Sequence, residues 1–189
     1  MRMESKMKKN IVLVLSDSHG QTRKVLQAIK RTKPDMLIHL GDIEDNPDVI
    51  QDYLNKVVNE KNGRDLKEYV RSIYVKGNCD RFYKSKMTKA MVIEINGHNV
   101  LVTHGHGFYV DDGLTDLLEV AKQHNCDIVM YGHTHKFLDE VIDGIRFLNP
   151  GSIAFPRQEP PTYMVIEFDD LGDYKVSKKI FWDEGERGL

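Results

Sequence analysis

Apolar and polar positions follow a regular alternation through the first 80 residues of the chain. Short continuous apolar runs predict strands that are buried on both faces, and longer stretches with apolar residues at helical spacing lie between them. The predicted order is strand, helix, strand, helix, strand, over residues 11–15, 21–32, 36–40, 47–62 and 70–75. This alternation favours parallel strands with helices packed outside the sheet.

Hairpin signals dominate the rest of the chain. Asn96-Gly97 and Asp143-Gly144 are strong turn signals for two hairpins, and a third hairpin is predicted near the end. The paired arms are 90–95 with 99–103, 137–142 with 145–148, and 163–168 with 174–181. A helix over 112–124 and a strand over 126–130 are predicted between the first two hairpins. We therefore expect one α/β (α+β) domain over residues 1–189, built from two mixed sheets packed face to face with helices outside.

Composition excludes several classes of protein. Of the 189 residues 40% are apolar and 30% charged, and the formal net charge is −2, so neither nucleic acid nor an anionic membrane surface is indicated as a partner. The longest apolar runs are of strand length, short of the roughly 20 residues that span a bilayer. There are two cysteines, Cys79 and Cys126, and no plausible secretory signal, so we expect a cytoplasmic protein with residues 1–9 as a polar leader.

Polar loops with metal-ligand side chains follow five predicted strands. In chain order the strand ends carry Asp17 and His19, Asp42, Asn78, His104, and finally His133 and His135. Ligands of α/β sheets bind in the crevice outside the carboxyl ends of the strands. Two imidazoles separated by one residue, such as His133 and His135, can serve one ion or two. Seven ligands are about the number that two metal ions need when one carboxylate bridges them and waters complete the shells.

Each of these residues also has an ordinary structural explanation. Asp17 can cap the helix that follows it, and Asp42 and Asn78 suit turn geometry. His104 and His106 can be loop histidines without a ligand. All these explanations would have to hold together at five consecutive strand ends, so the sequence predicts a metal site. Three further histidines are predicted to be structural or incidental: His39, His98 and His124.

Five sequence blocks carry a family resemblance. They are Asp17-x-His19, Gly41-Asp42, Gly77-Asn78-Cys79-Asp80, Thr103-His104-Gly105-His106 and Gly132-His133-Thr134-His135. In this order they resemble the calcineurin-like metallophosphoesterases, most closely the small single-domain phosphodiesterases of the YfcE type, over roughly residues 11–168. The resemblance implies a four-layer β-sandwich of two mixed sheets flanked by helices.

The resemblance also implies a dinuclear metal centre. Its residues would be Asp17, His19 and His135 for one metal, Asn78, His104 and His133 for the other, and Asp42 as the bridge. The implied ions are two divalent transition metals, usually manganese, although nickel, iron and zinc also suit these nitrogen and oxygen ligands. The implied reaction is hydrolysis of a small phosphodiester by a metal-bound hydroxide that attacks phosphorus in line.

Catalytic roles are implied for Asp42, Asn78, Cys79 and His106. Cys79 stands where many relatives have a histidine that assists the leaving group, and a thiol with a reference pKa of about 8.5 is a poorer acid near neutral pH. The proton donor is therefore Cys79 or His106. Arg81 and Lys136 lie beside ligands in the sequence and could contact phosphate, although for Lys136 a solvated surface position is the simpler explanation.

We therefore expect a phosphoric ester hydrolase, specifically a phosphodiesterase of small substrates. One alternative is a nuclease or nucleotide hydrolase of the same superfamily, which the absence of a basic excess disfavours. Another is a non-catalytic scaffold on the same fold, which the intact set of seven ligand positions disfavours. No membrane partner is expected, and a homo-oligomer is left open.

Overall fold

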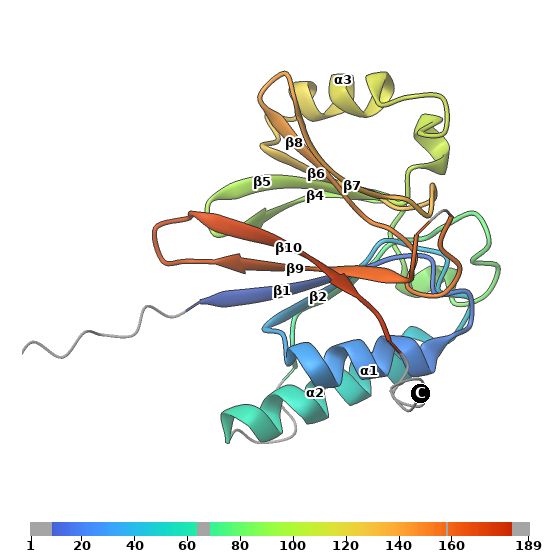
Figure 1. The fold of residues 1–189 in the computed structure, drawn as a ribbon, viewed down its shortest axis with the longest axis vertical. Helices are drawn as coiled ribbons and strands as arrows, with labels where there is room; N and C mark the ends of the chain where they lie inside the picture. Colours follow the sequence, from blue (N-terminus) through green and yellow to red (C-terminus); the bar gives the residue numbers. More distant parts are fainter. Residues whose placement is uncertain (1–8, 64–68, 158, 183–189) are drawn as a thin grey trace, which may run out of the picture.

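Two sheets form the centre of the computed structural model, which describes residues 9–63, 69–157 and 159–182. Helices α1 (Thr22–Thr32) and α2 (Pro47–Asn62) cover the outer face of one sheet, and α3 (Thr115–Gln123) covers the outer face of the other (Figure 1). The predicted architecture of two mixed sheets with helices outside is confirmed. The predicted polar leader lies outside the described residues, apart from Lys9.

The first sheet has five strands in the order β10-β9-β1-β2-β3. Their bounds are β1 (Asn10–Leu15), β2 (Met36–His39), β3 (Ser72–Tyr74), β9 (Thr162–Phe168) and β10 (Tyr174–Ile180). β1, β2 and β3 are parallel to one another, as the strand and helix alternation predicts, whereas β9 pairs antiparallel with both β1 and β10. The carboxyl ends of β1, β2 and β3 therefore meet at one edge of the sheet.

The second sheet also has five strands, in the order β4-β5-β6-β8-β7. Their bounds are β4 (Ala90–Ile95), β5 (His98–Thr103), β6 (Ile128–Met130), β7 (Phe137–Ile142) and β8 (Ile145–Pro150). β5, β6 and β8 are parallel, and the two edge strands pair antiparallel with their neighbours. Two short 3₁₀ turns, η1 (Lys84–Lys86) and η2 (His106–Phe108), belong to the loops after β3 and β5.

The continuous apolar run of strand β1 is explained by its burial on both faces of the sheet. Successive side chains of a strand point to opposite faces of the sheet. Val12 and Val14 lie in the core between the two sheets, whereas Leu13 and Leu15 pack under α1 and α2, and all four are fully buried. A strand covered on both faces needs apolar residues at every position.

Local sequence signals set the ends of α2, while α3 is shorter than predicted. The Asn46 side chain accepts a hydrogen bond from the Asp48 backbone N–H at 3.1 Å, Pro47 is the first helical residue, and Gly63 ends the helix with a φ of 63°. The prediction that a helix begins at residue 112 is wrong, because Gly113 has a φ of 145° and α3 begins only at Thr115.

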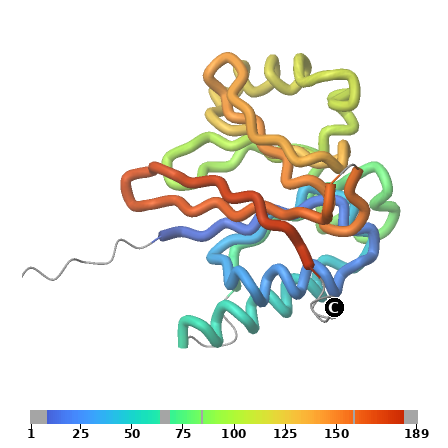
Figure 2. Tube along the Cα trace, in the orientation of Figure 1, coloured from blue at the N-terminus to red at the C-terminus, as the bar shows by residue number. Residues whose placement is uncertain are grey.

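Loops that leave both sheets gather at one end of the sandwich. Figure 2 shows those that follow β1, β2, β3, β5 and β8 at the end opposite the turn between β9 and β10. Within the described ranges, no helix combines the length and apolar character needed to cross a membrane.

Candidate metal centre

Left-handed backbone conformations shape the ligand loops. Asp17, His19, Asp42, His133 and His135 all have φ between 42° and 68°, a region that non-glycine residues rarely adopt. In the loops after β1 and β6 the two ligands stand two residues apart with a residue of ordinary φ between them. The Asp17 and His19 backbone N–H groups donate to Gly41 O and Asp42 O at 3.0 and 2.9 Å, so the first two loops are joined. Strained backbone held by such contacts is typical of functional sites.

Asp17, His19 and His135 form a compact group, here called the first half-site. His135 Nε2 lies 3.2 Å from Asp17 Oδ1 and 3.3 Å from His19 Nε2. The other oxygen of Asp17, Oδ2, accepts the backbone N–H of His133 at 3.1 Å, which fixes the carboxylate. Asp17 is fully buried, while the two imidazoles are partly exposed. The ligand atoms of all three residues lie within 4.8 Å of one another, as a single bound ion requires.

The predicted second group consists of Asn78, His104 and His133 and is here called the second half-site. His104 is fully buried, and its Nε2 lies 3.2 Å from the Asn78 side-chain oxygen. The His133 ring lies edge-on to the His104 ring, with centroids 5.2 Å apart. His133 thus faces the Asn78 and His104 side of the centre, and His135 faces the Asp17 and His19 side, as the resemblance implies.

Asp42 lies between the two half-sites. Its Oδ2 is 3.5 Å from His104 Nε2 and 3.9 Å from His19 Nε2, and its Oδ1 accepts the Cys79 backbone N–H at 2.8 Å. Gly77 must lack a side chain, because a Cβ there would overlap the Asp42 carboxylate. One oxygen of Asp42 is therefore placed to contact an ion on either side.

The contacts of the ring nitrogens show whether the four candidate ligand histidines can bind metal ions. In each of the four ligand histidines one nitrogen already faces a protein oxygen, which leaves the other nitrogen for a metal. The pairs are His19 Nδ1 with Glu44 Oε1 at 3.1 Å, His104 Nδ1 with Leu40 O at 2.7 Å, His135 Nδ1 with Phe155 O at 2.6 Å and His133 Nε2 with Asp111 Oδ2 at 2.9 Å. In addition, Asp17 Oδ1 is buried without a hydrogen-bond partner. The donor set fits two divalent cations.

The charges of the centre support the same conclusion. Burial alone would raise the carboxyl pKa values of Asp17 and Asp42, but His135 near Asp17 and His104 near Asp42 lower both. The pKa of His104 is raised by Asp42 and Asp17 against the effect of burial, and the Asp17 carboxylate, 3.2 Å from His135 Nε2, raises the pKa of His135. The carboxylates are thus ionised, and protons on the imidazoles compete with metal binding, so lower pH opposes it.

The two residues proposed to donate a proton contact different members of the second half-site. The Cys79 thiol accepts a hydrogen bond from the Asn78 amide at 3.2 Å, and burial together with Asp42 and Glu44 raises the pKa of Cys79 to about 12. His106 is exposed, with its ring centroid 5.4 Å from that of His104. Burial and the neighbouring His104 and His133 lower its pKa. The choice between Cys79 and His106 remains a prediction.

Arg81 and Lys136, the two residues considered for phosphate contacts, have different surroundings. Arg81 is exposed and lines a cavity of about 460 Å³ together with Glu44, Asn78, Cys79 and Phe82. Lys136 is exposed, and its backbone N–H donates to the Thr134 hydroxyl at 3.4 Å. Arg81 therefore borders the cavity beside the second half-site.

The explanation of Asp17 as a helix cap is wrong. The residue that precedes α1 is Gln21, which makes no side-chain capping hydrogen bond.

The three histidines predicted to be structural or incidental lie outside the ligand groups. His39 is buried and its Nε2 bonds Ser18 Oγ at 3.0 Å. Burial lowers the pKa of His39 to about 4, so it supports the loop as a neutral ring. His98 bonds Gly172 O at 2.8 Å and His124 follows the last residue of α3. None of these three histidines belongs to the ligand groups.

Asp80 holds two ligand loops together, a role that the sequence analysis above does not predict. It is 2% exposed, and its Oδ2 accepts the backbone N–H groups of Asp42 and Gly77, each at 2.8 Å. Its Oδ1 accepts the Glu44 N–H, also at 2.8 Å. An acidic residue two positions after a predicted ligand, in a loop rich in turn residues, was the available signal.

Asn149 and Ser152 support the opposite side of the centre. Asn149 Nδ2 donates to Gly132 O at 2.9 Å and to Thr134 Oγ1 at 3.1 Å, which holds the loop that carries His133 and His135. Ser152 Oγ donates to Asp17 O at 2.8 Å and so fixes the first ligand loop. Both residues are fully buried.

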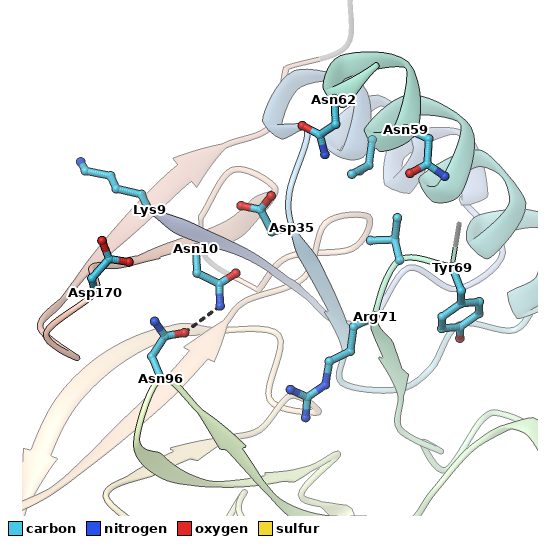
Figure 3. A pocket seen from close by; sticks show the side chains of 11 residues that line it. Lys9, Asn10, Asp35, Asn59, Asn62, Tyr69, Arg71, Asn96 and Asp170 are labelled. Atoms are coloured by element: carbon cyan, nitrogen blue, oxygen red, sulfur yellow. Dashed lines mark hydrogen bonds between the residues drawn. The ribbon is translucent and has the colours of Figure 1, made fainter. Parts of the chain in front are cut away.

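A second polar cavity lies at the amino end of β1, away from the ligand loops. Figure 3 shows its charged side chains, which include Lys9, Asp35, Arg71 and Asp170, and its volume is about 380 Å³. Charges of both signs line it. Across the described part of the chain, three groups of His, Cys, Asp or Glu side chains are close enough to hold an ion. All three contain residues of the ligand loops, and none lies in this polar cavity. The polar cavity is thus distinct in chemistry from the metal centre.

Comparison with known proteins identifies the family. Residues 11–171 match the model of the calcineurin-like phosphoesterase superfamily domain. A probable metallophosphoesterase of Mycoplasma pneumoniae is 32% identical over 175 residues, which cover 90% of this chain and 95% of that protein. Phosphodiesterase YfcE of Escherichia coli is 25% identical over 181 residues, covering 85% and 89%.

A solved structure agrees over nearly the whole chain. The crystal structure of a predicted phosphoesterase from Streptococcus pneumoniae TIGR4 is 32% identical, has a TM-score of 0.72 and covers 97% of this chain and 96% of its own. The family match, this fold and the ligand geometry lead to one assignment. The chain belongs to the calcineurin-like phosphoesterase superfamily, and its relatives include proteins named metallophosphoesterase and phosphodiesterase.

Proposed function

We propose that the protein hydrolyses small phosphodiesters at a centre of two divalent metal ions. The observation that carries the proposal is the position of Asp42 Oδ2, 3.5 Å from a nitrogen of the second half-site and 3.9 Å from one of the first. A carboxylate oxygen shared in this way is the usual bridge of two-metal hydrolytic sites. The orphaned Asp17 Oδ1 supports the same reading.

The chain's own residues hold and orient the reacting groups. Asp17, Asp42 and the four ligand imidazoles supply the negative charge and the lone pairs of the centre. When bound, two ions would neutralise the phosphoryl oxygens and lower the pKa of a water nucleophile. Cys79 and His106 lie beside the centre, and we assign the proton for the departing alkoxide to one of them.

Two cavities beside the centre favour a diester over a monoester. One, of about 460 Å³, includes Cys79, Arg81 and Phe82, and the other, of about 400 Å³, includes Lys76 and His106. A diester carries two alcohol groups on one phosphorus, and each cavity offers room for one of them. A monoester would fill only one.

Manganese is the ion we propose, acting in the cytoplasm. Carboxylate, amide and imidazole ligands without a thiolate suit Mn²⁺ as well as iron, nickel and zinc, and manganese is the usual activator in the family that the sequence resembles. Both cysteines are free thiols, which is consistent with a reducing compartment.

The test is hydrolysis of bis-p-nitrophenyl phosphate and p-nitrophenyl phosphate by protein purified without chelator. We expect about two equivalents of transition metal, stimulation by Mn²⁺ and faster hydrolysis of the diester. Less than one equivalent of metal, with no gain on adding Mn²⁺, would instead indicate a non-catalytic scaffold. Faster hydrolysis of the monoester would overturn the choice of substrate class.

A further inference from the structure

A cationic cavity adjoins the second half-site. Its volume is about 400 Å³, within the range of cavities that bind small molecules, and its walls include Lys76, Lys89, Thr103, His106 and Phe108. His106 connects it to the metal centre, since its ring lies 5.4 Å from that of His104 and 6.1 Å from that of His133. A group bound in this cavity would lie next to the phosphorus that the metal centre holds.

The charge of this cavity has one sign. Lys76 and Lys89 are the charged residues that line it, and no carboxylate does. Among the ion pairs between described residues, none involves either lysine. The cavity that contains Arg81 differs, because the carboxylate of Glu44 also lines it. Two ammonium groups beside a reaction centre, with no acidic residue in the same wall, favour an anionic ligand.

The backbone fixes where both lysines stand. The Lys76 N–H donates to Thr88 O at 2.7 Å, and the Thr88 N–H donates to Tyr74 O at 3.0 Å, so the segment before Lys89 is paired with the end of β3. The Thr103 hydroxyl donates to Lys89 O at 3.2 Å, which joins the same segment to the end of β5. Lys76 is half-buried, and Lys89 is exposed. The two ammonium groups therefore extend from a paired framework that is continuous with the ligand loops.

We propose that this cavity is a subsite for a second phosphate group of the substrate. The substrate class is then a phosphodiester in which one alcohol, such as a sugar, carries a further phosphate that Lys76 and Lys89 contact. Phe108 provides an apolar wall for the carbon skeleton between the two phosphates. Lysine binds phosphate as a point charge without bidentate geometry, so several positions of the second phosphate on that alcohol can be accommodated. This inference rests on the proposed phosphodiesterase function.

A matched pair of substrates tests the subsite. Thymidine 5′-(p-nitrophenyl phosphate) is compared with the same compound bearing a 3′-phosphate, and the readout is the ratio of their kcat/KM values. We expect the wild-type protein to prefer the phosphorylated compound by about tenfold. The assay is run at low salt, because salt screens the contact of a solvent-exposed side chain such as Lys89. The ratio should fall to near one in the Lys76→Ala/Lys89→Ala double variant and persist in Lys76→Arg/Lys89→Arg. Lys175→Ala, an exposed lysine on β10, should keep the wild-type ratio.

A binding measurement separates failure of the subsite from failure of the proposed function. Inorganic phosphate is titrated into metal-free protein, and backbone amide shifts of Lys76, Lys89 and Thr103 are followed by NMR. We expect saturable shifts that the double alanine variant lacks. If neither ester is hydrolysed, the proposed function fails and this titration alone decides on the subsite. Equal kcat/KM for the two esters, a preference retained in the double variant, or no saturable shifts in the wild type would overturn the subsite.

Discussion

The two half-sites differ in how firmly the protein holds their ligands. In the first, Asp17 is fully buried, its Oδ2 is fixed by the His133 backbone, and the His135 ring is fixed by a main-chain carbonyl. In the second, His104 is also buried and held by a main-chain carbonyl, but the other two ligands are held less firmly. Asn78 is exposed, and His133 is oriented by Asp111, whose side chain is 53% exposed. Preorganised ligands lose less conformational freedom on binding. We therefore expect the first half-site to bind its metal more tightly than the second.

Removing the shared carboxylate erases the difference between the half-sites. Asp42→Ala takes a ligand from both, so we expect hydrolysis of bis-p-nitrophenyl phosphate to fall below a few per cent of wild type and both metals to bind weakly. Activity and metal content are measured on the same sample. Asp170→Ala, at the opposite end of the molecule, is the control and should behave as wild type. Retention of more than a few per cent of activity by Asp42→Ala contradicts the bridge.

Removing one histidine from each half-site tests the comparison itself. His135→Ala should lose the tighter ion, and His104→Ala the weaker one, so each variant retains about one equivalent of metal instead of two. Both should lose at least about a hundredfold in kcat, since two-metal chemistry needs both ions. Metal analysis after dialysis gives the stoichiometry. If both variants lose all metal, the two half-sites are not separable.

Asp111 offers a subtler change to the second half-site alone. Its Oδ2 lies 2.9 Å from His133 Nε2, which leaves Nδ1 for the metal. Asp111→Asn should raise the dissociation constant of the weaker metal by about 10- to 100-fold, as for other outer carboxylates, and leave the tighter metal unchanged. Calorimetric titration with Mn²⁺ measures both steps. The neighbouring Asp112→Asn is the matched control, and equal effects of the two substitutions would remove Asp111 from the site.

The smallest effect is expected at Cys79. Cys79→His should change the dependence of rate on leaving-group pKa, because imidazole is a stronger acid than a thiol whose pKa is about 12. Metal content should stay at the wild-type level. The measurement is kcat/KM across aryl diesters with leaving groups of different pKa. An unchanged slope excludes Cys79 from proton donation and leaves His106.

Residues that end strands were predictable from the sequence, and residues that approach from elsewhere were not. The apolar runs located β1 and β2, and the polar residues after them located Asp17 and Asp42. Parallel strands bring such ends together, so short-range patterns were sufficient. The resemblance to a known family then supplied the pairing of ligands with ions.

The missing parts depend on packing across the molecule. Asp111 reaches His133 from the segment before α3, in the stretch where the predicted helix start was wrong. Lys76 and Lys89 share a cavity because an isolated β-bridge pairs Val75 with Thr88. No local sequence pattern predicts this bridge. Such contacts join residues that are distant in sequence or carry no periodic signal.

A crystal structure of the Mn²⁺-soaked protein, recorded at the manganese absorption edge, shows whether two ions share one centre. We expect two anomalous peaks roughly 3.5–4 Å apart. One should lie among Asp17, His19 and His135, the other among Asn78, His104 and His133, with Asp42 between them. A single peak at saturating Mn²⁺, or two peaks that do not share Asp42, would contradict it.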